Sequence, residues 1–227
     1  MYRRFAEPPL LDNPSASVGS AVTLKYVAAL LIFALALGLG LGLGLRRFPS
    51  TSPAPSSYTG LVARALLFNS STGEALGAVT LLQDNLTAPV FVDVAIYASN
   101  MPNLDADHGI HIHNTTLASQ AALDSLCVAA GGHFNPSKVN HTCSSATGHA
   151  GDLGSIFIRA GGASSARFVN ANISLVPGSP TSVLNRAIVL HADPDDCGVG
   201  GKADSKTTGH SGARLACGVI LAALGGF

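Results

Sequence analysis

The longest apolar run of the chain covers residues 26–45, where twenty consecutive positions carry no charge. As an α-helix with a rise of about 1.5 Å per residue, this run spans roughly 30 Å, the thickness of the hydrocarbon core of a bilayer. No face of the helix would be polar, which argues against a helix in a soluble core. We therefore predict an uncleaved transmembrane signal anchor. A cleaved signal peptide is the alternative, although the run is long for one and no clear cleavage site follows it.

The segments on either side of this run have a different composition. Residues 1–25 are predicted to form a short disordered tail. Residues 46–57, with the sequence RRFPSTSPAPSS, are predicted to form an extended linker rich in proline and serine. Basic residues flank the apolar run on both sides, so the positive-inside rule does not fix its orientation.

From residue 58 onward the pattern changes to short runs typical of β-strands, separated by turn-rich stretches. Two glycine-rich loops, 114–151 and 192–213, interrupt the strands, and ordered loops of this length are usually functional. We therefore predict one all-β sandwich or barrel over residues 58–227. The predicted strands are 61–68, 77–83, 89–98, 155–159, 167–175, 187–190 and 217–222.

Charge, cysteines and sequons add a location to this picture. The formal net charge is +0 and there is no basic run, so nucleic acid is not a predicted partner. The four cysteines and the five Asn-x-Ser/Thr sequons all lie beyond residue 57, which favours disulfides and an extracellular or luminal domain. The sequence leaves three cysteine pairings open. The cysteines are Cys127, Cys143, Cys197 and Cys217, and the sequons begin at Asn69, Asn85, Asn114, Asn140 and Asn172.

Histidines provide the candidate chemistry. His111 and His113 are two residues apart on a predicted strand, so both side chains point to one face and can bind one metal ion. Such a pair is by itself a modest signal, because ordinary core or surface histidines can have the same spacing. His191 ends another predicted strand. A set of three imidazoles and one carboxylate, suited to tetrahedral zinc, lies between them: His133, His141, His149 and Asp152.

Four sequence blocks resemble the signature motifs of copper–zinc superoxide dismutases. They are GIHIH from Gly109, GHFNP from Gly132, HAGDLG from His149 and GARLACGV from Gly212. The resemblance extends over about residues 61–227, with the blocks in that family's order. It implies a Greek-key β-barrel with long metal-binding and channel loops, preceded here by the N-terminal transmembrane helix. It also implies conversion of superoxide to oxygen and hydrogen peroxide by Cu(II)/Cu(I) cycling, with zinc in a structural role.

Residue by residue, the resemblance implies two metal sites that share one bridging imidazolate. The copper ligands would be His111, His113, His133 and His191, and the zinc ligands His133, His141, His149 and Asp152. The resemblance makes His133 and Arg214 the catalytic residues, with Arg214 beside the copper channel and Thr208 facing it. It also implies that Asp195 links a copper ligand to a zinc ligand and that Cys127 pairs with Cys217. Lys202 and Lys206 are further candidates for attracting the anion.

Some residues fall outside the family pattern. Cys143 and Cys197 are additional cysteines near the expected zinc and channel loops, and we expect them to form a disulfide, with free or intermolecular thiols as the alternative. The stretch between His113 and Cys127 is longer than the family pattern and is interpreted as a surface extension. His108 and His210 have no place in the ligand scheme and are interpreted as ordinary polar loop residues.

The leading hypothesis is a membrane-anchored superoxide dismutase whose catalytic domain is extracellular or luminal. Its expected partners are superoxide, the membrane through the N-terminal helix, and a second copy of the chain in a homodimer. A secreted form after signal cleavage is the alternative location. A non-catalytic copper-delivery module and a purely structural β-sandwich are the rival functions. The complete set of copper ligands together with Arg214 argues against a delivery module, and Arg214 and Asp195 argue against a structural sandwich, because a merely structural metal site needs neither.

Overall fold

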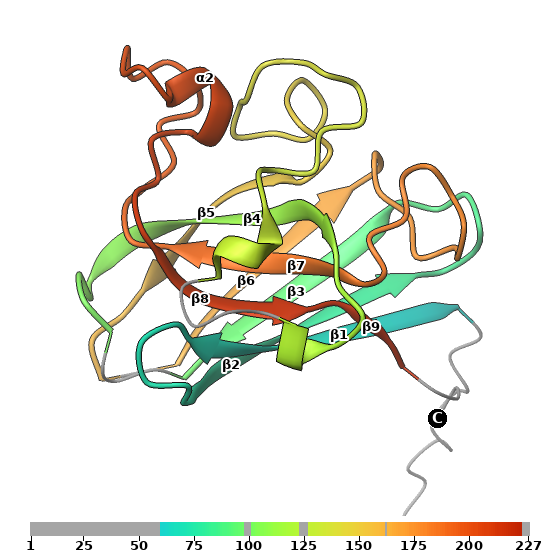
Figure 1. Ribbon diagram of the computed structural model, residues 1–227, viewed down its shortest axis with the longest axis horizontal. Coiled ribbons are helices and arrows are strands. Elements are labelled where there is room, and N and C mark those ends of the chain that lie inside the picture. The colour runs from blue at the N-terminus through green and yellow to red at the C-terminus, as the bar shows by residue number, and fades with distance from the viewer. Residues whose placement is uncertain (1–59, 98–100, 123–126, 162, 224–227) are drawn as a thin grey trace, which may run out of the picture. The chain divides into compact units, whose positions relative to one another are not determined.

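The computed structural model describes residues 60–97, 101–122, 127–161 and 163–223 (Figure 1). These residues fall in the unit Pro53–Phe227, which is distinct from the unit Met1–Ser52. The predicted tail (1–25), transmembrane anchor (26–45) and linker (46–57) lie outside the described residues. Within the described ranges, no helix has the length and apolar character needed to cross a membrane.

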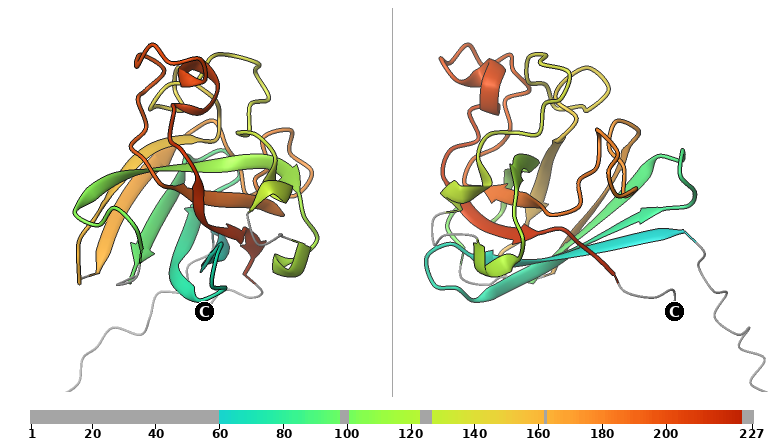
Figure 2. Two further views of the ribbon diagram at one scale, coloured as in Figure 1. Left: turned by 60° about the vertical axis from the view of Figure 1, so that its left-hand side comes forward. Right: turned by 45° about the vertical axis from the view of Figure 1, so that its right-hand side comes forward.

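The described residues form a nine-stranded antiparallel sheet, as the all-β prediction requires. The strand order is β5-β4-β7-β8-β1-β2-β3-β6, with short β9 paired to β1. β4 pairs with β7, and β3 with β6, so the β3–β4 and β6–β7 connections cross over as in a Greek key. β5 and β6, at the two ends of this order, contact each other and give a barrel-like sheet (Figure 2). The strands are β1 Leu61–Asn69, β2 Ala75–Gln83, β3 Val90–Ile96, β4 Ala106–Thr116, β5 Asp152–Ile158, β6 Ser164–Asn170, β7 Arg186–His191, β8 Arg214–Val219 and β9 Leu221–Ala222.

Alternating side chains build the core of the barrel. In β3, every second residue is buried, because successive side chains of a strand point to opposite faces. The inward residues of β3 pack with those of the other strands into one large apolar cluster. The inward set in β3 is Val90, Val92, Val94 and Ile96.

Strand β7 is buried on both of its faces, and its two sets of side chains belong to different apolar clusters. Ile188 and Leu190 face the main core, whereas Ala187 and Val189 belong to a second small cluster that includes Cys127 and Cys217. The long connection after β4, which contains the short 3-10 helices η1 (Gln120–Ala122) and η2 (Val128–Ala130), covers this outer face. A continuous apolar run of this kind is typical of a strand covered on both sides.

The predicted strand 167–175 was wrong at both ends. β6 begins at Ser164 and ends at Asn170, beyond which Ser174 forms only an isolated bridge with Ser182. The side chain of Asn170 explains this end. Its amide nitrogen donates to the Ala150 carbonyl, and its oxygen accepts a bond from the Asn172 backbone, closing a local turn that competes with strand pairing.

His108 was wrongly interpreted as an ordinary loop residue. It lies within β4 and is 0% exposed. Its Nδ1 atom lies 2.8 Å from the His191 carbonyl oxygen, and its Nε2 atom lies 3.0 Å from the Asn103 carbonyl oxygen. The ring therefore ties β4 to the last residue of β7. His210, in contrast, is exposed, as the sequence predicted, and contacts Asp204.

Replacing His108 with alanine is expected to destabilise the metal-free protein by about 2–4 kcal/mol, because it leaves a buried cavity and removes the ring N–H that donates to a backbone carbonyl. His210→Ala is the matched control and should change stability by no more than about 0.5 kcal/mol, since His210 and its contact with Asp204 are exposed. Chemical denaturation measures both values. Equal effects of the two substitutions would contradict the role assigned to His108.

Candidate metal centre

Two strands and one loop bring the first group of histidines together. His111 and His113 lie on β4, His191 ends β7, and His133 lies in the loop after η2, where it forms an isolated bridge with His113. All four residues are buried. One nitrogen from each lies within 4.8 Å of the others. The four imidazoles can therefore surround a single metal ion, and they are the four residues that the family resemblance implied as copper ligands.

A second group lies in the loop that leads into β5. It consists of His133, His141, His149 and Asp152, again buried and with one ligand atom each within 4.8 Å of the others. Asp152 is the first residue of β5, and its Oδ2 atom accepts bonds from the backbone of Thr142 and His149. These two bonds fix the carboxylate, so its Oδ1 atom faces the three rings.

The distances within the second group fit a tetrahedral metal ion. The Nδ1 atoms of His133 and His141 lie 3.0 Å from Asp152 Oδ1, and that of His149 lies 3.2 Å away. A tetrahedral zinc ion with bonds of about 2.0 Å holds its ligand atoms about 3.3 Å apart. The Nδ1 atoms of His141 and His149 are buried and, among the described residues, form no hydrogen bond. Buried polar atoms are rarely left without a hydrogen-bond partner, and a bound metal ion would take the place of that partner.

The first group also has ligand atoms at the separation expected around one metal ion, and buried nitrogens without a hydrogen-bond partner among the described residues. The Nε2 atoms of His113 and His191 lie 3.3 Å apart, the separation of two ligands on one ion. The His111 Nδ1 and His133 Nε2 atoms are buried without a hydrogen-bond partner in the described part of the chain. His133 thus offers Nδ1 to one group and Nε2 to the other. The residues fit two metal ions joined by one imidazole ring.

Outer hydrogen bonds orient the rings. Asp195 Oδ2 lies 2.9 Å from His111 Nε2, and Asp195 Oδ1 lies 2.7 Å from His141 Nε2, so one carboxylate joins a ligand of each group. The carbonyl of Gly131 contacts His113 Nδ1 at 2.8 Å. Each contact leaves the opposite nitrogen free to face the metal position. The carbonyl contact could not be predicted from residue type, because every residue carries a carbonyl.

Gly209 is a further residue that the sequence reasoning missed. A Cβ atom there would collide with the Asp195 carboxylate and the His141 ring, and its φ of +64° is one that glycine adopts readily. Nothing in the sequence around Gly209 distinguishes it from the other glycines of the loop.

Burial and charge set the protonation of the rings. Burial lowers the pKa of His133 to about 4 and holds the pKa values of His113 and His191 well below their usual range. These rings are therefore neutral at pH 7, the form that binds metal. Burial also opposes charge on His141, but the nearby carboxylates of Asp152 and Asp195 outweigh it and raise the pKa of His141 to about 9.

Zinc binding to the metal-free protein is therefore expected to release about one proton per ion at pH 7. The His141 ring is protonated below pH 9 and must become neutral to bind. Zinc affinity should accordingly rise with pH, and proton release should disappear above pH 9. Titration calorimetry in buffers of different ionisation enthalpy measures the released protons. Binding at pH 7 without proton release would contradict this account.

Of the residues predicted to line the channel, Arg214 lies next to the first ligand group, whereas the side chains of the others make no described hydrogen bond to a ligand. Arg214 begins β8, and its guanidinium donates to the carbonyls of Cys127 and Gly131, each at 2.6 Å. Because Gly131 also contacts His113, Arg214 is adjacent to the first group of ligands. Thr208 lies in helix α2 (Ser205–Thr208) and donates to the Asp204 carbonyl; the described contacts do not join it to a ligand histidine. Lys202 and Lys206 are exposed.

Two disulfides hold the loops. Cys127 is joined to Cys217 and Cys143 to Cys197, so of the three possible pairings the structure adopts the expected one. The first attaches the loop after β4 to β8. The second joins the loop of the second metal group to the loop that carries Asp195, and these two loops lie side by side at one end of the barrel (Figures 1 and 2).

The fold and the site together define a Greek-key β-barrel protein with two metal sites bridged by one histidine. The model of the copper/zinc superoxide dismutase family matches residues 75–220. A protein named Cu-Zn superoxide dismutase from Candida glabrata is 40% identical over 145 residues, which cover 63% of this chain and 88% of that protein. The chain therefore belongs to the copper/zinc superoxide dismutase family. It is an oxidoreductase with copper and zinc as cofactors.

Proposed function

We propose that the chain dismutates superoxide with copper bound by the first group and zinc by the second. The observation that carries this assignment is the ring of His133, whose two nitrogens face different ligand groups. The second group includes the carboxylate of Asp152 and resembles a closed zinc site. The first group consists of imidazoles alone, which suit a redox-active copper ion.

Copper bound at the first group would supply one-electron chemistry, oxidising one superoxide to oxygen and reducing a second to hydrogen peroxide with two protons, one from His133 and one from solvent water. The chain supplies the proton path. His133 Nε2 takes up a proton and returns it to the product, while Nδ1 remains turned to the second group.

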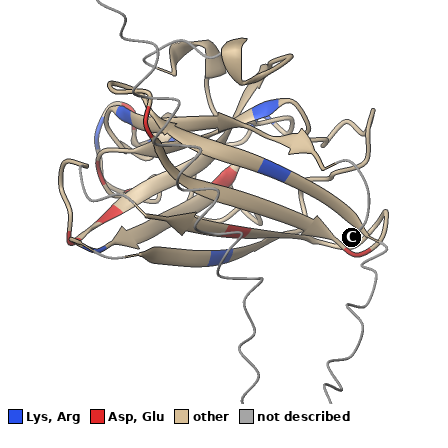
Figure 3. Ribbon diagram, turned by 90° about the horizontal axis from the view of Figure 1, so that it is seen from below, with Lys and Arg blue, Asp and Glu red and all other residues tan. Residues whose placement is uncertain are grey.

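Arg214 would attract and orient the substrate anion. Charged residues of both signs are scattered over the barrel (Figure 3), so a local positive group rather than the overall field is needed to guide superoxide. The two carbonyl contacts of Arg214 fix its guanidinium close to the first group. Thr208, Lys202 and Lys206 are proposed to line the approach.

Anomalous diffraction from the metal-loaded protein, recorded at the copper and zinc absorption edges, tests the assignment of the two metals. Copper is expected between His113 and His191, and zinc beside Asp152. Copper beside Asp152 with zinc between His113 and His191 would overturn it.

We propose that the catalytic domain lies outside the cytosol, attached through residues 26–45. All four cysteines are in disulfides, which indicates a non-reducing compartment. Both Asn85 and Asn172 are exposed, but their side chains are hydrogen-bonded differently. Asn85 accepts a bond from Thr87 through Oδ1, whereas the amide nitrogen of Asn172, the atom that would carry a glycan, donates to the Ser145 carbonyl. We therefore expect a glycan at Asn85 in preference to Asn172.

Expression of the full chain in a secretory host tests this location. The domain is expected in the membrane fraction, protected from protease added on the cytoplasmic side, and with Asn85 glycosylated. A soluble product that begins after residue 45 would support the secreted form instead. A reduced, unglycosylated domain exposed to the cytoplasm would overturn the proposal.

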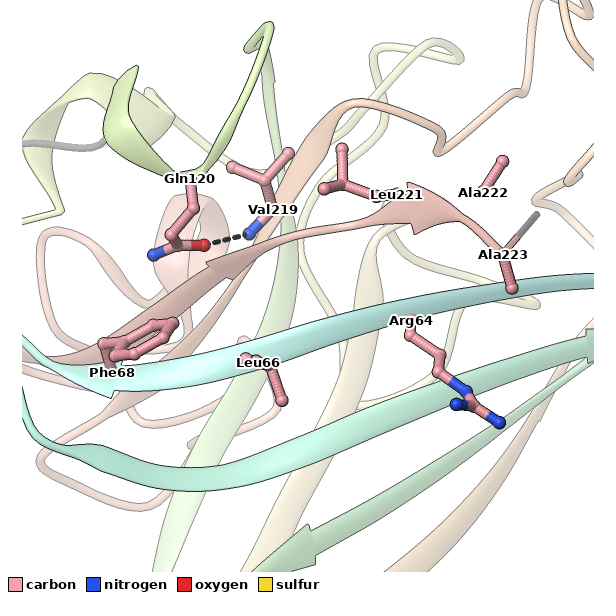
Figure 4. Close-up of a pocket in the computed structure, with 8 residues that line it drawn as sticks. All are labelled: Arg64, Leu66, Phe68, Gln120, Val219, Leu221, Ala222 and Ala223. Carbon is pink, nitrogen blue, oxygen red and sulfur yellow. Dashed lines mark hydrogen bonds between the residues drawn. The ribbon is translucent and has the colours of Figure 1, made fainter. Parts of the chain in front are cut away.

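A homodimer is proposed through the face formed by β1, β8 and β9. An apolar groove of about 560 Å³ lies there, lined mainly by the side chains of Leu66, Phe68, Val219 and Leu221 (Figure 4). Leu66 is 57% exposed and Leu221 40%. An apolar surface with little charge suits a second copy of the same face.

Leu66→Lys should convert the dimer to a monomer in analytical ultracentrifugation of the metal-loaded protein. Val169→Lys, at a position 59% exposed on β6, is the matched control and should leave the dimer intact. A wild-type monomer would overturn the dimer proposal.

A further inference from the structure

We propose that the Cys143–Cys197 disulfide positions His141 and Asp195 for zinc binding before the metal arrives. This inference rests on the zinc site proposed above. Cys143 and Cys197 are the two cysteines that fall outside the family pattern. We assign them the role of positioning the zinc ligands rather than of raising the overall stability of the fold.

The disulfide closes a small ring around one hydrogen bond. Cys143 follows the ligand His141 by two residues, and Cys197 follows Asp195 by two residues. His141 Nε2 and Asp195 Oδ1 lie 2.7 Å apart. The cross-link between Cys143 and Cys197 thus joins the two segments whose side chains make that bond.

The backbone of Cys197 acts directly on the same carboxylate. Its N–H donates to Asp195 Oδ1 at 2.8 Å, the atom that also contacts His141. Cys197 has a φ of +59°, an uncommon conformation for a residue other than glycine, and the disulfide helps to hold it there. Loss of the cross-link therefore frees the donor that fixes the carboxylate.

The two loops joined by the Cys143–Cys197 disulfide also approach each other closely near His141. The His141 backbone donates to the Lys206 carbonyl, and a Cβ at Gly198 would collide with the His141 carbonyl. The loops have little regular secondary structure, α2 being four residues long, so few backbone ladders hold them. A covalent link lowers the entropy that the loops must lose when four ligands assemble around an ion.

Transfer of zinc from the loaded full chain to a chromophoric chelator tests the proposal. The double variant Cys143→Ser/Cys197→Ser is expected to release zinc at least about tenfold faster than the wild type, the effect typical of losing a group that orients a ligand. The matched control is Cys127→Ser/Cys217→Ser, which removes the other disulfide. It should lower the unfolding temperature while changing the zinc-release rate less than about twofold, because neither residue contacts the zinc ligands.

Repeating the substitution in an Asp195→Ala background separates positioning from general stabilisation. If the disulfide acts through Asp195, its removal there should change zinc release less than about twofold. Equal release from the wild type and the Cys143/Cys197 variant would overturn this inference alone. A tenfold effect that persists without Asp195 would overturn the positioning role. Failure of the wild type to bind zinc would overturn both the inference and the proposed zinc site.

Discussion

His191→Ala is expected to lower the dismutation rate per chain at least about 100-fold. This loss exceeds the one typical of replacing a residue that only hydrogen-bonds to a metal ligand. His191 is buried at the end of β7, and its Nε2 lies 3.3 Å from that of His113. It belongs to the first ligand group and not to the second. The substitution should therefore remove copper while leaving zinc bound. Metal analysis together with the rate of superoxide decay measures both effects.

His149→Ala is the matched control for this prediction. His149 is a buried ligand of the second group only. Its loss should weaken zinc binding, with a smaller decrease in rate, less than about tenfold per bound copper. If His149→Ala abolished turnover while His191→Ala preserved it, the division of the residues into two sites would be wrong.

Arg214→Ala is expected to lower kcat/KM for superoxide by about 10- to 100-fold while both metals stay bound, because steering by a local positive charge contributes on this scale. The salt dependence of the rate should decrease as well. Arg214→Lys should recover only part of the rate, since the compact ammonium lacks the planar guanidinium whose separate nitrogens reach the Cys127 and Gly131 carbonyls and fix the charge in place.

Arg159→Ala controls for the change in net charge. Arg159 is exposed and follows β5 at the end opposite Asp152, so its loss should alter kcat/KM less than about twofold. Release of copper from Arg214→Ala would contradict the steering role, because it would make Arg214 a structural residue.

Strand periodicity predicted part of the site, and the resemblance to the superoxide dismutase motifs supplied the full ligand set. The spacing of His111 and His113 placed both rings on one face, and the run before His191 predicted a strand that ends at that residue. The same alternation places His108 on the face of Ile110 and Ile112. The burial of His108 was missed because the strand was not extended back to Ala106, not because the pattern lacked the signal.

Contacts between loops could not be predicted from periodicity. Spacing along the chain allows three disulfide pairings, and only the approach of the two loops around Asp195 brings Cys143 to Cys197. The backbone carbonyl that orients His113 is likewise invisible in residue types. The end of β6 depended on one asparagine side chain, a local interaction that overrides strand propensity.

Superoxide turnover by the purified protein, with its metals quantified, decides whether the two metal sites form a dismutase. The rate of superoxide decay is expected to rise in proportion to bound copper, up to one ion per chain, and protein loaded with zinc alone should be inactive. Absence of dismutation at one bound copper per chain would contradict this assignment, and would favour a protein that carries copper without catalysis.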